Sequence, residues 1–145
     1  MPRSRSRFSV TACVLVRRDE RWLLSVRGAE VDYAPGSLGL IGGHVEHDDP
    51  AEDVLEATAR RELIEETGVD LAGIPLRYVA SELFSAGEDD LQVTVTFVAD
   101  APLEAEPITR SDELAEVGWW TLAEVEADPR CPTWLPGLIR RAAAR

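Results

Sequence analysis

The sequence contains no run of eighteen or more apolar residues, so no transmembrane helix is expected. The first residues, Met1–Arg7, are basic and rich in serine, but no apolar signal-peptide core with a small-residue cleavage site follows them. Internal repeats and low-complexity linkers are also missing. These absences predict a cytoplasmic protein with a flexible basic tail over residues 1–6 and no membrane association.

Cysteine is scarce, with only Cys13 and Cys131 in the chain. Two cysteines so far apart form neither a metal-ligand cluster nor a disulfide framework. Cys13 lies in an apolar segment typical of a strand, which predicts a buried free thiol.

Positive charge is in the minority, since 15 basic residues against 27 acidic ones give a formal net charge of -12. Duplex binding needs clustered Lys and Arg against phosphates, so stable nucleic-acid binding through a basic surface is excluded. A polyphosphate substrate would be repelled unless some of the carboxylates held a divalent cation against it. Most of the acids are expected only to keep the surface soluble.

The residues that are present fit one globular domain over residues 7–145, with 45% hydrophobic residues. Short turns join sequential strands, so the sheet should be mixed and covered by helices. The patterns predict strands at 8–16, 22–27, 38–41, 78–84, 92–99 and 116–120, turns at 19–20 and 86–90, and helices at 122–127 and 134–144.

The longest helix is predicted from Pro50 to Thr67. Asp49 is a good capping residue, and Glu52 follows it at the spacing of a capping box. Proline is tolerated at the first helical position, and Gly68 is a natural C-terminal cap.

One face of this helix changes character along its length. At about 100° per residue, a single stripe holds Leu55 and Ala59, then Glu62 and Glu66, with Glu65 at its edge. Carboxylates on a core-facing stripe are unfavourable unless they are paired or bind metal. Either this face is exposed and its glutamates are solvated, or the glutamates bind a hard divalent cation, and the stripe alone does not decide between the two.

Residues 61–69, Arg-Glu-Leu-Ile-Glu-Glu-Thr-Gly-Val, together with the earlier Gly43-His44-Val45-Glu46, resemble the signature of the Nudix hydrolase family. That signature runs glycine, an intervening acid, Arg-Glu, an aliphatic, any residue, Glu-Glu, any residue, glycine and an aliphatic. Its second half matches at every defined position. Leu40-Ile41-Gly42-Gly43 is similar to the Gly-Gly segment that leads into the signature.

The chain departs from the family pattern at the middle acid, which should lie six residues after the glycine and eight before the arginine. Counting from Gly43 gives Asp49, whereas counting from Arg61 gives Asp53. The signature therefore holds about four extra residues, which we expect to add one helical turn at the start of the helix. The metal site should survive, and the middle acid is either of the two aspartates.

The resemblance implies an α/β/α sandwich with a mixed sheet, over roughly Phe8–Arg140, that hydrolyses a phosphoanhydride bond in a nucleoside diphosphate derivative or a nucleoside triphosphate. It implies that Glu62, Glu65 and Glu66 hold Mg²⁺ or Mn²⁺ with the backbone carbonyl of Gly42. Glu65 or Glu62 would be the general base, and Arg61 would orient the glutamates. Glycines at 42 and 43 would let the backbone approach the metal.

Other residues have two interpretations each. Arg27 is placed for a family substrate contact or is a solvated charge at a strand end, and Tyr33 stacks on a base or packs locally. The two histidines, His44 and His47, are either plain loop residues or contacts to phosphate. The rings of Trp119 and Trp120 either pack in the core or stack on a base. Three acids outside the signature could supply the general base: Glu82, Glu88 and Glu113.

The competing function is a nucleotide sensor that has a Nudix fold but no turnover. Intact Arg61, Glu62, Glu65 and Glu66 speak against it, as does the lack of an attached DNA-binding module. A chance match in an unrelated acidic protein is a third hypothesis. The substrate is a small-molecule nucleotide whose identity the sequence does not reveal, and a homodimer, common in the family, is left open.

Overall fold

The computed structural model describes residues 5–85 and 90–145. The chain begins with a hairpin of β1 (Phe8–Arg18) and β2 (Arg21–Arg27). Asp19 in the turn has a left-handed backbone (φ 54°), a conformation that aspartate tolerates. The strands and the turn predicted here are confirmed, with β1 two residues longer than expected.

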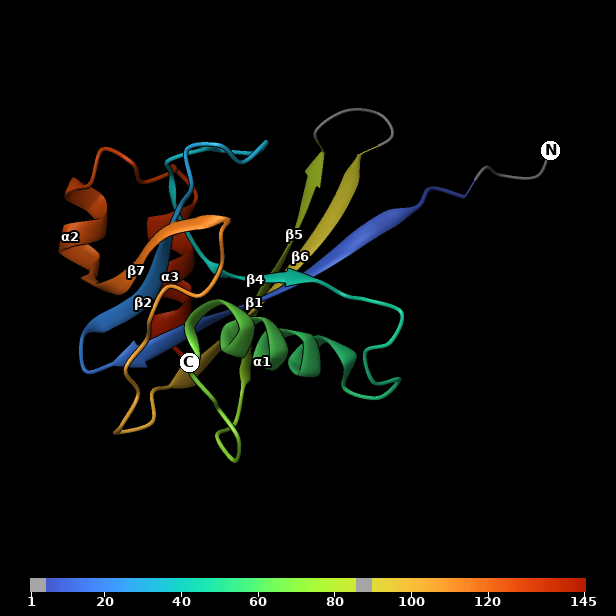
Figure 1. The fold of residues 1–145 in the computed structure, drawn as a ribbon, viewed down its shortest axis with the longest axis horizontal. Helices are drawn as coiled ribbons and strands as arrows, with labels where there is room; N and C mark the ends of the chain where they lie inside the picture. The colour runs from blue at the N-terminus through green and yellow to red at the C-terminus, as the bar shows by residue number, and fades with distance from the viewer. Residues whose placement is uncertain (1–4, 86–89) are drawn as a thin grey trace.

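Strand β1 is the centre of the sheet (Figure 1). One of its edges pairs in parallel with β6 (Leu91–Asp100) from Phe8 to Arg17. Its other edge is shared: residues 11–14 pair with β4 (Ile41–His44), and residues 16–18 pair with β2. Because β2 and β4 pair with different parts of the same edge of β1, the two strands diverge. β4 can therefore lie against the helix that follows it in the chain.

The other strands extend this arrangement into the mixed sheet that the sequence predicts. β5 (Arg77–Ser85) is antiparallel to β6, while β3 (Leu38–Gly39) and β7 (Leu114–Thr121) pair with β2. The predicted turn at 86–90 lies largely outside the described residues. The segment predicted as one short strand at 38–41 is instead two strands, β3 and β4, separated by Leu40.

Helices cover both faces of the sheet, as in the predicted α/β/α sandwich (Figure 1). On one face, α1 (Val54–Thr67) packs Ala59 and Leu63 against even-numbered residues of β1 such as Val14. On the other face, α2 (Leu122–Ala127) and α3 (Leu135–Ala143) pack on a core that contains Leu15. Within the described part of the chain, no helix has both the length and the apolar character needed to cross a membrane.

The start of α1 differs from the prediction. The helix begins at Val54, so the expected start at Pro50 and the extra helical turn are wrong. Asp53 precedes it with a left-handed backbone (φ 50°) and makes no side-chain capping hydrogen bond. The capping box expected at Asp49 and Glu52 does not form, and residues 50–53 belong to the loop. The predicted end is confirmed: Gly68 (φ 76°) donates its N–H to the carbonyl of Ile64.

Replacing Leu63 with alanine should lower the free energy of unfolding by about 2–5 kcal/mol, because Leu63 is fully buried under the sheet. Leu55→Ala should have a smaller effect, since Leu55 is only partly buried. Ile64→Ala on the exposed side of the same helix is the matched control. Urea unfolding measures all three, and a loss at Ile64 as large as that at Leu63 would contradict this orientation of α1.

Candidate functional site

The second half of α1 brings acidic side chains against β4. Leu63 and Ala59 hold the helix on the sheet, and the same side of the helix then carries Glu62 and Glu66. Glu66 is only 9% exposed, and the Glu62 side chain is 13% exposed. Glu65 lies further round the helix and its side chain is 56% exposed. The hypothesis that these glutamates lie solvated on an exposed face is therefore wrong for Glu62 and Glu66, whereas it describes Glu65.

The two glycines of β4 leave room for different neighbours. A Cβ at Gly43 would overlap the carboxylate of Glu62. A Cβ at Gly42 would overlap the carbonyl oxygen of Ala12 and the side chain of Cys13. Gly43 therefore lets the Glu62 carboxylate lie directly against the β4 backbone, and Gly42 lets β4 lie close to β1.

Acidic groups are concentrated at this junction. Burial first, and then the neighbouring Glu62, raise the pKa of Glu66 to about 8, whereas a backbone hydrogen bond from Gly42 opposes the shift. Burial also raises the pKa of Glu62, against the effect of Arg61. The thiol of Cys13, a buried free cysteine as predicted, has its pKa raised to about 12 by burial and then by Glu66 and Glu62. The ionised form of each group is disfavoured chiefly because burial removes water from the charge.

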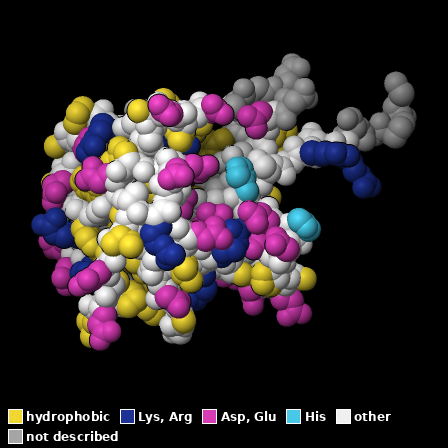
Figure 2. Space-filling view, viewed as in Figure 1, with side chains coloured by type: hydrophobic (Ala, Val, Ile, Leu, Met, Phe, Trp, Pro, Cys, Tyr) yellow, Lys and Arg dark blue, Asp and Glu magenta, His cyan; other side chains and the backbone are white. Residues whose placement is uncertain are grey.

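Acidic side chains also gather at the surface of this face, around an arginine and beside the two histidines of the chain (Figure 2). Arg61 on α1 lies within 4.0 Å of four carboxylates, those of Glu46, Asp49, Glu62 and Glu65. The net charge of this cluster is therefore negative.

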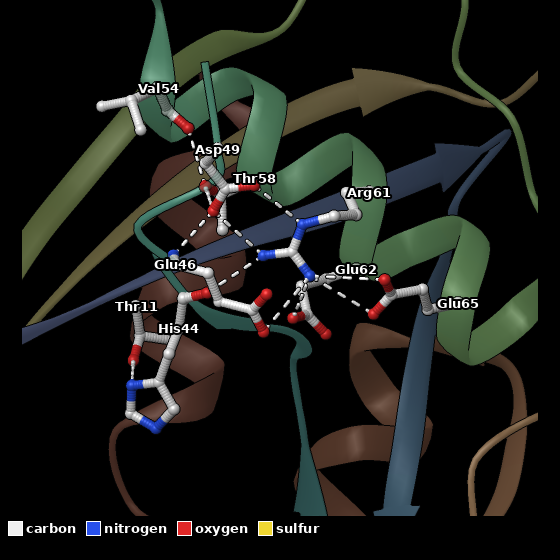
Figure 3. Close-up of polar contacts among 9 residues, drawn as sticks. All are labelled: Thr11, His44, Glu46, Asp49, Val54, Thr58, Arg61, Glu62 and Glu65. Atoms are coloured by element: carbon white, nitrogen blue, oxygen red, sulfur yellow. Dashed lines mark hydrogen bonds and ion pairs between the residues drawn. The ribbon is translucent and has the colours of Figure 1, made fainter. Parts of the chain in front are cut away.

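The guanidinium of Arg61 binds different carboxylates on its two sides (Figure 3). Its Nε and Nη2 atoms donate to the carboxylate of Asp49 at 2.9 and 3.1 Å. Its Nη1 atom donates to Glu62 at 2.9 Å and reaches Glu65 at 3.3 Å. Nη2 also donates to the backbone carbonyl of His44 at the end of β4. Arg61 thus connects the loop, the strand and the helix.

Of the two aspartates that the spacing allowed as the middle acid, Asp49 is the one that contacts Arg61. Its side chain is 5% exposed. It also accepts hydrogen bonds from the backbone N–H of Glu46 and from the hydroxyl of Thr58. These donors, Arg61 first, lower the pKa of Asp49 to about 2. Asp53 is exposed, and its side chain makes no capping bond at the helix it precedes.

The donors present fit a hard divalent cation in their chemistry. Mg²⁺ and Mn²⁺ prefer carboxylate and carbonyl oxygens, and Glu62 and Glu66 offer carboxylates beside the backbone of Gly42. Across residues 5–85 and 90–145, no three His, Cys, Asp or Glu side chains converge closely enough to hold a metal ion. Glu65, the third predicted ligand, is directed towards Arg61 instead.

Two residues distant in sequence reach the acid pair electrostatically. Arg27 lowers the pKa of Glu66 and Glu113 raises it, so both charges lie near that carboxylate. They approach it together because β2 pairs with β7, where a bulge follows Val26 and Gly28 donates its N–H to the carbonyl of Glu113. The Nε atom of Arg27 donates to the backbone of Tyr33, whose ring is 63% exposed.

The remaining candidates are less closely tied to the acids. His44 is exposed beside the Thr11 hydroxyl at 3.4 Å, and His47 is exposed in the loop. Trp120 is in the core, whereas Trp119 is partly buried and packs against Arg18. Glu82 is partly buried opposite Thr94, and Glu88 lies outside the described residues.

Comparison with known proteins agrees with this architecture. The NUDIX domain family matches residues 7–141. The chain therefore belongs to the Nudix hydrolase family, whose members generally act on nucleoside diphosphate derivatives and typically use divalent metal ions. A search of curated proteins found no match.

Solved structures share the fold at low sequence identity. The MutT NUDIX hydrolase from Burkholderia pseudomallei is 22% identical, with a TM-score of 0.76 over 94% of this chain and 98% of that one. The MutT protein from Methanosarcina mazei Go1 is 21% identical, with a TM-score of 0.73 over 98% and 97%. The NUDIX domain of Shewanella oneidensis NrtR, solved with ADP ribose, is 26% identical, with a TM-score of 0.71 over 98% and 89%.

Without a divalent cation, Glu66→Gln should stabilise the protein at alkaline pH. The pKa of Glu66 rises from 4.5 to about 8 on folding, so the protonated form is favoured in the folded state. The contribution of Glu66 to stability is therefore fully present below about pH 4.5 and is lost as the pH rises through 8. At pH 9 the variant should exceed wild type by a few kcal/mol, on the order of magnitude that such a shift implies.

Urea unfolding from pH 5 to pH 9 in the presence of a chelator makes this measurement. Glu56→Gln, on the first turn of the same helix, is the control and should follow wild type at every pH. Wild type more stable than Glu66→Gln at pH 9 would show that the Glu66 carboxylate is already compensated within the protein.

Proposed function

We propose that this protein is a Mg²⁺-dependent hydrolase, also able to use Mn²⁺, that cleaves a phosphoanhydride bond in a nucleoside diphosphate derivative or a nucleoside triphosphate. The observation that carries the proposal is the pair of largely buried carboxylates beside β4: Glu62 lies against Gly43, and Glu66 accepts a backbone hydrogen bond from Gly42. Burying two carboxylates side by side is unfavourable unless one of them is protonated or a cation joins them.

In this proposal Glu62, Glu65, Glu66 and the carbonyl of Gly42 are the metal ligands. The bound cation would neutralise phosphate oxygens and lower the pKa of a water molecule. Glu65 is the most accessible of the three acids and needs to turn from Arg61 to join the others. Arg61 orients Glu62 and Glu65 and has no free edge with which to bind substrate.

The general base is Glu65 or Glu62, which accepts the proton of the attacking water. Glu113, outside the signature, is a further candidate because its charge acts on Glu66. Protonated Glu66 is a poor metal ligand, so the raised pKa also implies that metal binding releases a proton.

Arg27 is the proposed contact to the substrate phosphates. Its charge reaches the acid pair, and its guanidinium is oriented by the carbonyl of Tyr33. The exposed ring of Tyr33 lies on the same loop and is available to stack on a base. We assign the substrate to the small-molecule nucleotides.

The alternative is a nucleotide-binding module without turnover. The likeness to the NUDIX domain of NrtR, which was solved with ADP ribose, favours this second candidate and makes ADP ribose a ligand to test. The hydrolase is preferred because Arg61, Glu62, Glu65 and Glu66 are all present in this chain.

The protein should hydrolyse at least one member of a panel of nucleoside triphosphates, nucleotide sugars and ADP ribose with Mg²⁺, with phosphate and pyrophosphate release both measured. Glu66→Gln should lose more than about 100-fold in activity, because even the loss of residues that support metal ligands costs 10–100-fold. Glu56→Gln on the same helix should remain active. Binding of a panel member without any turnover would favour the sensor, and full activity of Glu66→Gln would remove that residue from the site.

Arg27→Ala should raise the KM for the best substrate by about tenfold while kcat changes less, as expected for loss of an interaction made with both ground and transition states. Arg21→Ala is the matched control: Arg21 is at the opposite end of β2 and pairs with Glu124. Steady-state kinetics compare the two variants. An unchanged KM in Arg27→Ala would mean that Arg27 is only a charge at the end of a strand.

A further inference from the structure

Arginine side chains gather at the end of the sheet where β1 and β6 finish and β5 begins. Arg17, near the end of β1, pairs in register with Asp100, the last residue of β6. Its Nη2 and Nε atoms donate to one carboxylate oxygen of Asp100 at 3.1 and 3.3 Å. Arg77, the first residue of β5, approaches the other oxygen of that carboxylate with its Nη2 atom at 3.9 Å. A single carboxylate therefore lies between two guanidinium groups.

The end of α3 brings further arginines to the same place. Nη2 of Arg141 donates to the backbone carbonyl of Val79 at 3.2 Å, and Nη2 of Arg145 reaches the same oxygen at 3.4 Å. Val79 is two residues from Arg77, about 7 Å along a strand. Both lie on the side of the sheet that α3 covers, because Val79 and Val98, the partner of Arg77 in β6, belong to the core beneath that helix. In Figure 1 the C-terminus accordingly stands beside the ends of β1 and β6.

Little on this surface compensates the positive charge. Among the described residues, Asp100 is the one carboxylate within 4.0 Å of these four arginines, and its side chain is 63% exposed. The Nε atom of Arg77 is buried and finds no hydrogen-bond partner in the part of the chain that the structure describes. A helix C-terminus favours nearby cations, which suits Arg141 in the last turn of α3. This effect is short-ranged and does not account for the arginines on the strands.

The geometry points to a second ligand site in this protein, where Arg77 and Arg141, with Arg17 beside them, bind a phosphate group. We call it the α3 phosphate site. Guanidinium groups carry planar pairs of N–H donors that match the oxygens of a phosphate. Three positive side chains against one aspartate attract an anion here, although the whole chain carries a net charge of -12. Arg145 adds to this charge, but the site does not require it.

The α3 phosphate site is separate from the acid site. Glu66 belongs to α1, and α1 and α3 cover opposite faces of the sheet. A phosphate group can therefore bind beside α3 without a metal ion and without entering the acid site. The inference stands or fails independently of the proposed hydrolase activity.

Titration of metal-free protein with inorganic phosphate tests the inference. Metal is removed with a chelating resin, because a soluble chelator would itself compete as a polyanion, and about 150 mM NaCl screens unspecific attraction. Calorimetry measures the affinity, and ¹H–¹⁵N NMR should show shifts at Arg77, Asp100 and Arg141 rather than at Glu66. AMP is the second titrant: tighter binding than inorganic phosphate at the same residues assigns the site to a phosphorylated small molecule, and equal or weaker binding assigns it to free phosphate. Succinate, a dicarboxylate, should bind more weakly than phosphate.

Four variants attribute the binding to individual side chains. Arg77→Gln and Arg141→Gln should each weaken phosphate binding by about tenfold, because each removes charge-assisted hydrogen bonds. Asp100→Asn should strengthen binding, since it removes the carboxylate that competes with the ligand for Arg77, and a merely structural effect would not produce this gain. Arg140→Gln is the matched control: it removes the same charge from the same turn of α3, but Arg140 pairs with Glu126 at 2.8 Å, so this variant should bind as wild type does. Thermal unfolding checks that every variant is folded.

Three results would overturn the inference. Inorganic phosphate and AMP might both leave the signals of the α3 phosphate site unshifted in wild type. Succinate that bound as tightly as phosphate would show a general attraction for anions. Arg140→Gln that weakened binding as much as Arg141→Gln would show that affinity follows total charge and not the placement of these arginines.

Discussion

The placement of two carboxylates against a glycine backbone is the constraint on which this site depends. Glu62 and Glu66 are buried on one side of α1. Leu63 packs this helix on the sheet and so holds the two glutamates in place. The close approach of Glu62 depends on Gly43, where a Cβ would overlap its carboxylate, and Gly42 keeps β4 close to β1. It also needs β4 to pair with residues 11–14 of β1 alone, so that β4 can lie beneath the helix. Sheet topology, glycine placement and helix packing thus serve the same junction.

Arg61 could neutralise this junction, but its geometry restricts it. A guanidinium has a planar set of donors, and an edge occupied by one carboxylate is unavailable to another. Asp49 and the carbonyl of His44 take the Nε and Nη2 side, so Glu62 receives a bond from Nη1 and Glu66 receives none from this arginine in the described structure. A lysine at this position would be a single point charge with rotatable donors and would not divide its contacts in this way. The arrangement preserves excess negative charge where a cation is proposed to bind.

The sequence predicts those parts of the structure that depend on local pattern. The strands follow from alternation, and the end of α1 follows from Gly68, whose left-handed backbone suits glycine. The start of α1 was mispredicted because Asp49 followed by proline has the local features of a helix start, while its carboxylate is used by Arg61 and Thr58 farther along the chain. No local pattern could place Glu113 near Glu66 either, since that proximity arises from the pairing of β2 with β7. Tertiary contacts, not propensities, decide both cases.

Charge also constrains how a substrate could bind. The chain has a net charge of -12, and the arginine within the acid cluster is already held by carboxylates. Glu62 and Glu113 both raise the pKa of Glu66, whereas Arg27 lowers it less, so acidic charge outweighs basic charge near that carboxylate. A polyphosphate approaching this site in the proposed function would therefore need cations for most of its neutralisation. Cation and nucleotide would then each increase the affinity for the other by the same factor, because such coupling is reciprocal. The acids that would repel a nucleotide without metal therefore make nucleotide binding depend on the metal.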